Sequence, residues 1–154
     1  MTEEMMRVPL ILRGPGVNRS LDSQSLVANI DLAPTIRELY GLAVPETCQG
    51  RSLCSLMAGD ENAEWRAGLM TEHYGLHEHV WQRAWYCGRW KFVLQGHGFK
   101  DLYDLADDPF DCRNLAGDGH YRERRQMMLD GRLVALQRVG DVPVVSGDSE
   151  ASAG

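Results

Sequence analysis

A short apolar run near the start of the chain limits what this sequence can fold into. Residues 8–12 read VPLIL and are followed directly by the turn-forming residues 13–16, RGPG. A continuous apolar run bounded by turn residues predicts a strand that is covered on both faces of a sheet. Such a strand needs neighbouring strands, and seven residues precede it here. We therefore expect it to belong to a larger α/β sheet whose other strands lie elsewhere.

A helix is expected directly after this region. Asp31 is a good N-cap, because its carboxylate can accept hydrogen bonds from the free amides of a first helical turn. Pro34 then falls within that first turn, where a missing N–H costs little, and Gly41 suits the C-terminal stop. A catalytic acid at Asp31 is the alternative, but capping is the better explanation. The segment between these residues is therefore predicted to be helical.

The second half of the sequence predicts a small antiparallel sheet with a closing helix. Residues 79–95 hold two aromatic-rich runs on either side of Cys87-Gly88, a pattern typical of a β-hairpin. A third strand is expected near residues 102–103, and residues 119–138 show a helical apolar pattern. The expected buried stripe of that helix is Tyr121, Met128, Leu129, Leu133 and Leu136. The sequence as a whole therefore predicts an α+β fold.

Composition excludes several classes of protein. The formal net charge of −6 argues against non-specific nucleic-acid binding, which depends on Lys and Arg neutralising phosphates. No apolar run is long enough for a membrane span, and MTEEMMRVPL does not resemble a signal peptide, so a soluble chain is expected, in a compartment that the sequence does not specify. The four cysteines are scattered without a CxxC pair, which makes a structural zinc site a poor explanation for them.

Several short motifs, taken in order along residues 3–116, resemble the C-terminal portion of the sulfatase family. The motifs are Glu3-Glu4 with RVPL, then RGPG, DLAPT, GRSL, GRWK, DLYDL and NLA. Each motif alone is weak, but their common order is specific. The sequence departs from the family pattern at three positions, where Tyr86, Trp90 and Asp111 replace a common Arg, Tyr and Glu. These departures affect the expected substrate specificity.

The resemblance implies an alkaline-phosphatase-like fold, of which this chain would form the last part. Residues 1–65 would be the tail end of the α/β core, with a strand, a helix and a loop. Residues 66–139 would form a C-terminal antiparallel-sheet subdomain that packs on the closing helix. Residues 140–154 are rich in Gly, Ser and acidic residues with little apolar content, and are expected to be a disordered tail.

The resemblance also implies a chemistry that this chain does not carry. Sulfatases use a formylglycine, made from Cys or Ser in a C/S-x-P-S-R motif, and a divalent cation, usually calcium, that stabilises charge on the sulfate. Cys48 comes nearest to that motif, but Gly50 stands in place of Pro and Ser52 in place of Arg. The family's metal ligands and its active-site Lys and His lie upstream of Glu3. We therefore expect the chain alone to be inactive, with no cofactor or metal of its own.

A histidine-rich stretch next to the hairpin supplies the candidate substrate-binding residues. Residues 72–79 read EHYGLHEH. The family's subdomain borders the active site, so His73 and His77 would contact the sugar or aryl group of the substrate. Arg83 would pair with a sulfate or carboxylate through forked hydrogen bonds. Solvent-exposed loop histidines, or a transition-metal site, are alternative interpretations of the stretch.

Other polar and aromatic residues have simpler explanations. Arg89 and Lys91 are expected on the outward face of an edge strand, where charge also blocks aggregation, with contact to a substrate anion as the alternative. Three aromatic residues are expected to pack in the core, with sugar stacking as the alternative: Trp81, Trp85 and Trp90. Three acidic residues are expected to form turns, because the Gly and the final Glu of an EF-hand are absent: Asp101, Asp104 and Asp108.

Three functions remain open from the sequence. The first is a C-terminal fragment of a sulfuric ester hydrolase, acting on sulfated carbohydrates or aryl sulfates, whose partner is the missing N-terminal catalytic half. The second is a non-catalytic accessory module that contacts carbohydrate. The third is a fragment of a phosphonate or phosphodiester hydrolase of the same superfamily. Neither nucleic acid nor membrane is expected as a partner.

Overall fold

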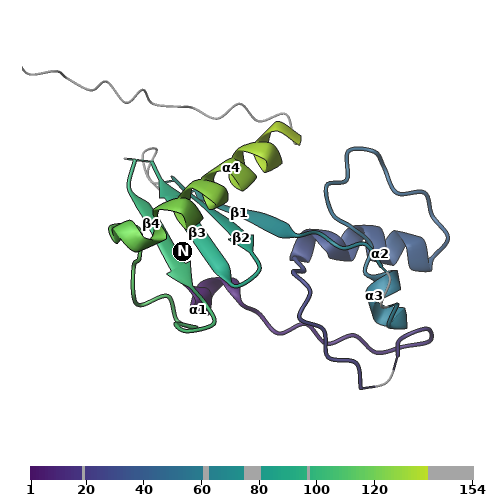
Figure 1. Ribbon diagram of the computed structural model, residues 1–154. Helices are drawn as coiled ribbons and strands as arrows, with labels where there is room; N and C mark the ends of the chain where they lie inside the picture. Colours follow the sequence, from purple (N-terminus) through teal and green to yellow (C-terminus); the bar gives the residue numbers. More distant parts are fainter. Residues whose placement is uncertain (19, 61–62, 75–80, 97, 139–154) are drawn as a thin grey trace, which may run out of the picture. The chain divides into compact units, whose positions relative to one another are not determined.

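The structure is a computed structural model that describes residues 1–18, 20–60, 63–74, 81–96 and 98–138 (Figure 1). The chain divides into two compact units: one holds residues 7–69, and the other holds residues 1–6 together with the chain from Met70 onward. The elements in chain order are α1 (Glu3–Met6), η1 (Asn29–Asp31), α2 (Leu32–Leu39), α3 (Cys54–Ala58), β1 (Gly68–Tyr74), β2 (Trp81–Cys87), β3 (Trp90–Gln95), β4 (Lys100–Asp104), η2 (Gly119–Tyr121) and α4 (Arg122–Arg138).

The four strands form one sheet in the order β1-β2-β3-β4. Strands β2 and β3 are an antiparallel hairpin in which Cys87 pairs with Trp90, and Gly88 takes the positive φ of +56° that its turn requires. Strand β4 adds to β3 in antiparallel register, with Phe92 opposite Leu102. The predicted hairpin and third strand are therefore confirmed. Strand β1 is an additional strand that the sequence analysis missed.

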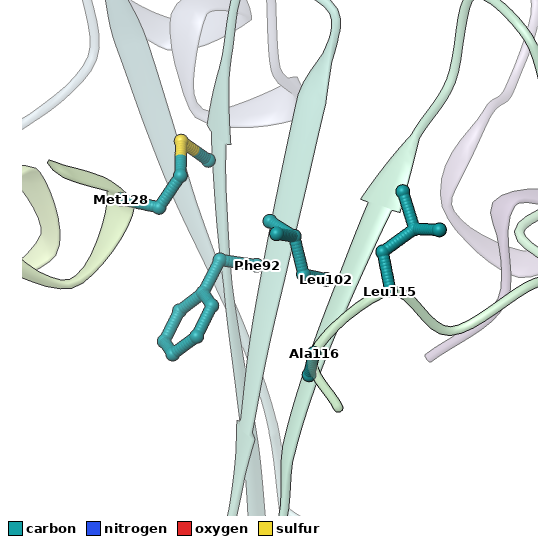
Figure 2. Packing of buried hydrophobic residues seen from close by; sticks show 5 residues of the cluster. All are labelled: Phe92, Leu102, Leu115, Ala116 and Met128. Carbon is teal, nitrogen blue, oxygen red and sulfur yellow. The ribbon is translucent and has the colours of Figure 1, made fainter. Parts of the chain in front are cut away.

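The core of the sheet unit lies between one face of the sheet and α4, as Figure 2 shows for five of its residues. Phe92 and Leu102 are fully buried. Burying each side chain stabilises the folded state by about 1.5–3 kcal/mol. Of the predicted helix stripe, Met128 and Leu136 are buried and the other three residues are half-buried. Gly131 of α4 lets the helix approach the sheet closely, because a Cβ there would lie 3.0 Å from the Trp85 indole nitrogen. The α+β fold with a sheet packed on a closing helix is thus confirmed.

The other unit contains η1, α2 and α3. The predicted helix is present as α2, with Pro34 in its first turn and Gly41 at a φ of +65° after its end. The predicted cap is wrong, because the Asp31 side chain accepts no hydrogen bond from the first turn of α2. Instead, the Asp31 carboxylate is committed to partners outside this helix, described below. Helix α2 begins at Leu32, directly after the last residue of η1, Asp31.

The apolar run at residues 8–12 forms no strand in the structure, so the prediction of a buried strand is wrong for the chain as described. Val8 is 75% exposed and Ile11 is 89% exposed. A strand that is buried on both faces needs partners on either side. The four strands of the described residues pair only with one another. The run therefore has the composition of a buried strand, but no described strand pairs with it.

No helix within the described part of the chain is both long and apolar enough to cross a membrane.

Candidate functional site

A buried lysine is the centre of a polar cluster on the sheet face opposite α4. Side chains alternate along a strand, so Lys91 points away from the face on which its neighbour Phe92 packs. Lys91 is 0% exposed. Its ammonium donates to the Met1 carbonyl oxygen at 2.8 Å, to Glu3 Oε1 at 2.9 Å and to Asp111 Oδ2 at 2.7 Å. These three acceptors satisfy all three donors of the ammonium group.

The neighbouring strands complete this cluster with two tyrosines. Tyr86 lies opposite Lys91 on β2, and its hydroxyl donates to Glu3 Oε1 at 3.0 Å. Tyr103 lies opposite Lys91 on β4, where burial, followed by the nearby Asp101 carboxylate, raises its pKa to about 12. Asp111 reaches the ammonium from a backbone φ of +47°, a conformation that Asp tolerates better than most residues.

These contacts hold residues 1–6 against the sheet. The Lys91 ammonium has no donor left for a substrate, and its two carboxylates are paired with it. The arrangement therefore favours an anchoring role over a chemical one. The prediction that Lys91 lies on the outward face of an edge strand is wrong, because β3 is flanked by β2 and β4 and the residue is fully buried.

Arg83 lies on the sheet face that packs on α4. Its Nε is 2.6 Å from Glu72 Oε1, and its Nη2 donates to the Tyr74 hydroxyl at 3.4 Å. Its guanidinium also lies 5.4 Å from the centre of the Trp81 ring. The side chain is 15% exposed. A substrate anion at Arg83 would therefore have to share it with Glu72.

Of the predicted substrate-binding residues that the structure describes, His73 and Arg83 do not lie on the same face of the sheet. His73 is exposed on β1, between Glu72 and Tyr74. Since both of those residues contact Arg83, the alternation of a strand directs His73 to the opposite face, which carries the Lys91 cluster. His77 lies outside the described residues. The interpretation of residues 72–74 as a loop is wrong, because they belong to strand β1.

A second buried charge, Asp31, organises the unit of residues 7–69. Its carboxylate is fully buried and accepts from the Ala28 and Arg51 amides, each at 2.8 Å. It also pairs with the Arg66 guanidinium at 2.5 Å. The Thr35 hydroxyl, one helical turn after Asp31, accepts from the Leu53 amide at 2.8 Å. Asp31 and Thr35 together therefore hold the GRSL loop through the amides of Arg51 and Leu53. Enclosed and fully committed, this carboxylate is a structural clamp and not a catalytic acid.

The simpler interpretations of the remaining side chains hold only in part. Asp101 and Asp104 were predicted to form turns, but both belong to strand β4. Trp85 and Trp90 pack against the core cluster. The prediction that Arg89 lies on the outward face of an edge strand is wrong, because it lies in the hairpin turn between β2 and β3, where it pairs with Asp104 and Asp107. The pKa of Arg89 is raised, chiefly by its hydrogen bond to Asp104. These contacts explain the residues without a ligand.

The described residues do not fit a formylglycine and calcium centre. Within the described ranges, no group of three His, Cys, Asp or Glu side chains is close enough to hold a metal ion. Cys48 is a free cysteine that lacks the Pro and Arg of the nucleophile motif. No step of a hydrolytic mechanism can therefore be assigned to these residues.

Comparison with known proteins decides the family. The family model of N-sulphoglucosamine sulphohydrolase, C-terminal, matches residues 1–139. The chain belongs to the sulfatase family. It is 32% identical over 126 residues to the delta 4,5-hexuronate-2-O-sulfatase of Bacteroides thetaiotaomicron, covering 77% of this chain and 26% of that protein. It is 28% identical over 128 residues to mouse (Mus musculus) arylsulfatase K, covering 75% of this chain and 23% of that protein.

Solved structures agree with this assignment. A 2-O GAG sulfatase superposes with a TM-score of 0.74 at 25% identity, over 83% of this chain and 29% of that chain. A phosphonate monoester hydrolase from Silicibacter pomeroyi shares the fold, with a TM-score of 0.72 at 22% identity, over 82% of this chain and 28% of its own. This sulfatase chain thus spans about a quarter of the length of the curated relatives named above. The predicted alkaline-phosphatase-like C-terminal fold is confirmed.

Proposed function

We propose that this chain is the C-terminal portion of a sulfatase that, as a whole, hydrolyses sulfate esters of carbohydrates, and that the chain is inactive alone. The observation that supports this most is the family match over residues 1–139, in a chain that spans 26% of its hexuronate-sulfatase relative. Hydrolysis needs an activated oxygen nucleophile and fixed positive charge at the sulfate. The described residues supply neither, so the formylglycine and calcium would belong to the other three quarters of the enzyme.

The role of this chain would be to support the active site and to contact the substrate beyond the sulfate. The Lys91 cluster would fix residues 1–6 to the subdomain sheet. His73, exposed on the same face, and His77 would contact the sugar, whereas Arg83 is directed to the other face of the sheet. If so, replacing His73 and His77 with Ala in the complete enzyme raises KM with little change in kcat. Unchanged kinetics would remove both residues from the site.

A domain replacement tests the proposal. Residues 1–139 would replace the matching C-terminal region of the Bacteroides hexuronate sulfatase, and hydrolysis of that enzyme's sulfated sugar would be measured. We expect the chimera to retain measurable activity. The same enzyme truncated before that region, and this chain alone, should show none. Metal-dependent turnover by this chain alone would refute the proposal. Tight binding of unsulfated and sulfated sugar alike by the isolated chain would favour the accessory-module alternative.

A phosphonate or phosphodiester hydrolase is the second candidate. The fold similarity to the phosphonate monoester hydrolase, with a TM-score of 0.72, favours it. Fold similarity alone does not choose between the two ester types, since both displacements need the same kinds of group. Assaying the complete enzyme on a sulfate monoester and a phosphonate monoester with the same aryl leaving group would separate them. Preference for the phosphonate would replace the first proposal.

A further inference from the structure

A buried arginine on α4 has no counter-ion among the described residues. Arg132 is 5% exposed, and its Nε is enclosed without a hydrogen-bond partner. It lies one turn from each of the buried residues Met128 and Leu136, so it shares their face of the helix. That face packs on β2 and β3. The guanidinium therefore lies in the layer between α4 and the sheet, which is otherwise apolar at Phe92 and Leu102.

The charges around Arg132 make its position costly. Burial lowers the pKa of its guanidinium, and repulsion from Arg83 lowers it further. Arg83 is itself paired with Glu72, whereas Arg132 has no ion-pair partner among the described residues. A guanidinium does not lose its proton under ordinary conditions, so the charge of Arg132 persists. Charges that are buried without a partner are rare because their desolvation is not repaid.

We propose that Arg132 is the centre of an anion site between α4 and the sheet that binds a small oxyanion of the sulfate type. The planar guanidinium offers two parallel donors that match two oxygens of such an ion. Arg132 keeps 5% of its surface exposed to solvent. Arg83 adds attraction for an anion while it stays paired with Glu72. The site is separate from the Lys91 cluster, which lies on the opposite sheet face, and it does not depend on the proposed hydrolysis.

Binding of radiolabelled inorganic sulfate to the full 154-residue chain tests this site directly. Equilibrium dialysis would be carried out at constant ionic strength with chloride as the balancing ion. We expect saturable retention of one sulfate per chain, weakened at least about tenfold in Arg132→Met. Arg122→Met, which changes an exposed arginine of the same helix, should bind like the unchanged protein. Competition by glucosamine 6-sulfate, but not by glucosamine, would show that an esterified sulfate group also enters.

Thermal unfolding distinguishes an empty anion site from an internal ion pair. In chloride alone, Arg132→Met should unfold at the same temperature as the unchanged protein or higher, because it removes a buried charge that lacks a partner. Sulfate should raise the unfolding temperature of the unchanged protein more than that of Arg132→Met. No saturable sulfate retention, or equal retention by Arg132→Met, would overturn the proposal. A clearly lower unfolding temperature of Arg132→Met in chloride would also overturn it, because the guanidinium would then have a partner within the protein.

Discussion

Replacing Lys91 should destabilise the sheet unit more than any other single change to a charged residue there. Lys91→Met keeps a long apolar stem but removes the ammonium that contacts Met1, Glu3 and Asp111. Both carboxylates are nearly enclosed, with 4% and 5% exposed side chains, and would lose their cation. Removing one partner of a buried ion pair costs about 3–5 kcal/mol. For a unit of this size, each kcal/mol lowers Tm by about 4–8 °C, so we expect a fall of at least about 12 °C.

Thermal unfolding followed by tryptophan fluorescence would measure this loss. Lys100→Met, an exposed position on β4, is the matched control and should change stability by about 0.5 kcal/mol or less. The triple variant Lys91→Met, Glu3→Gln, Asp111→Asn removes all three charges and should recover most of the stability, since no buried charge is then left unpaired. A cost below about 1 kcal/mol for Lys91→Met, the range of exposed pairs, would show that water reaches the cluster and would refute the reasoning.

Three further outcomes test other parts of the structure. Asp31→Asn should cost about 3–5 kcal/mol, because Arg66 would lose its buried counter-ion; faster hydrogen exchange of the amides that Asp31 holds would report it, and unchanged exchange would contradict it. Gly50→Ala should cost about 1–3 kcal/mol, since its Cβ would lie 2.1 Å from a backbone carbonyl oxygen, whereas Gly14→Ala meets nothing within 4 Å and should be nearly neutral in denaturant unfolding. Tyr103 has its pKa raised from 10.0 to about 12, so the stability linked to its protonated form is complete below pH 10 and is lost as the pH rises toward 12; ultraviolet titration of tyrosinate should lose its highest step in Tyr103→Phe.

The parts of the fold that were predictable are those set by local pattern. The hairpin around Cys87 follows from two aromatic-rich runs with a glycine between them, and α4 follows from its apolar spacing. Strand β1 was missed because its sequence, GLMTEHY, ends in polar residues that read as a loop. Its edge position explains this, since an edge strand with exposed residues needs no alternating apolar pattern.

The buried Lys91 cluster was not predictable from spacing. Lys91 stands in an apolar run between Trp90 and Phe92, and that isolated charge was the available signal. Its partners are 88 and 20 residues away in sequence, at Glu3 and Asp111. Pairings over such separations depend on the register of the sheet, which local sequence does not give. The same limit explains why His73 and Arg83, close in sequence, point to opposite faces of the sheet.

Many of the exposed large apolar residues lie in the unit of residues 7–69, which includes the run that the sequence predicted to be buried. Val8 and Ile11 are 75% and 89% exposed, and Ile36 on α2 and Tyr40 directly after it are 55% and 78% exposed. A sequence pattern records the environment in which a segment is stable, but neighbouring segments must supply that environment. In a chain that spans 26% of its hexuronate-sulfatase relative, the sheet unit supplies its own neighbours and the VPLIL segment does not. Large apolar residues that are exposed together mark interaction surfaces. The absence of neighbouring strands for VPLIL among the described residues explains why the strand prediction was wrong. The same absence agrees with the proposal that this chain is one part of a larger sulfatase.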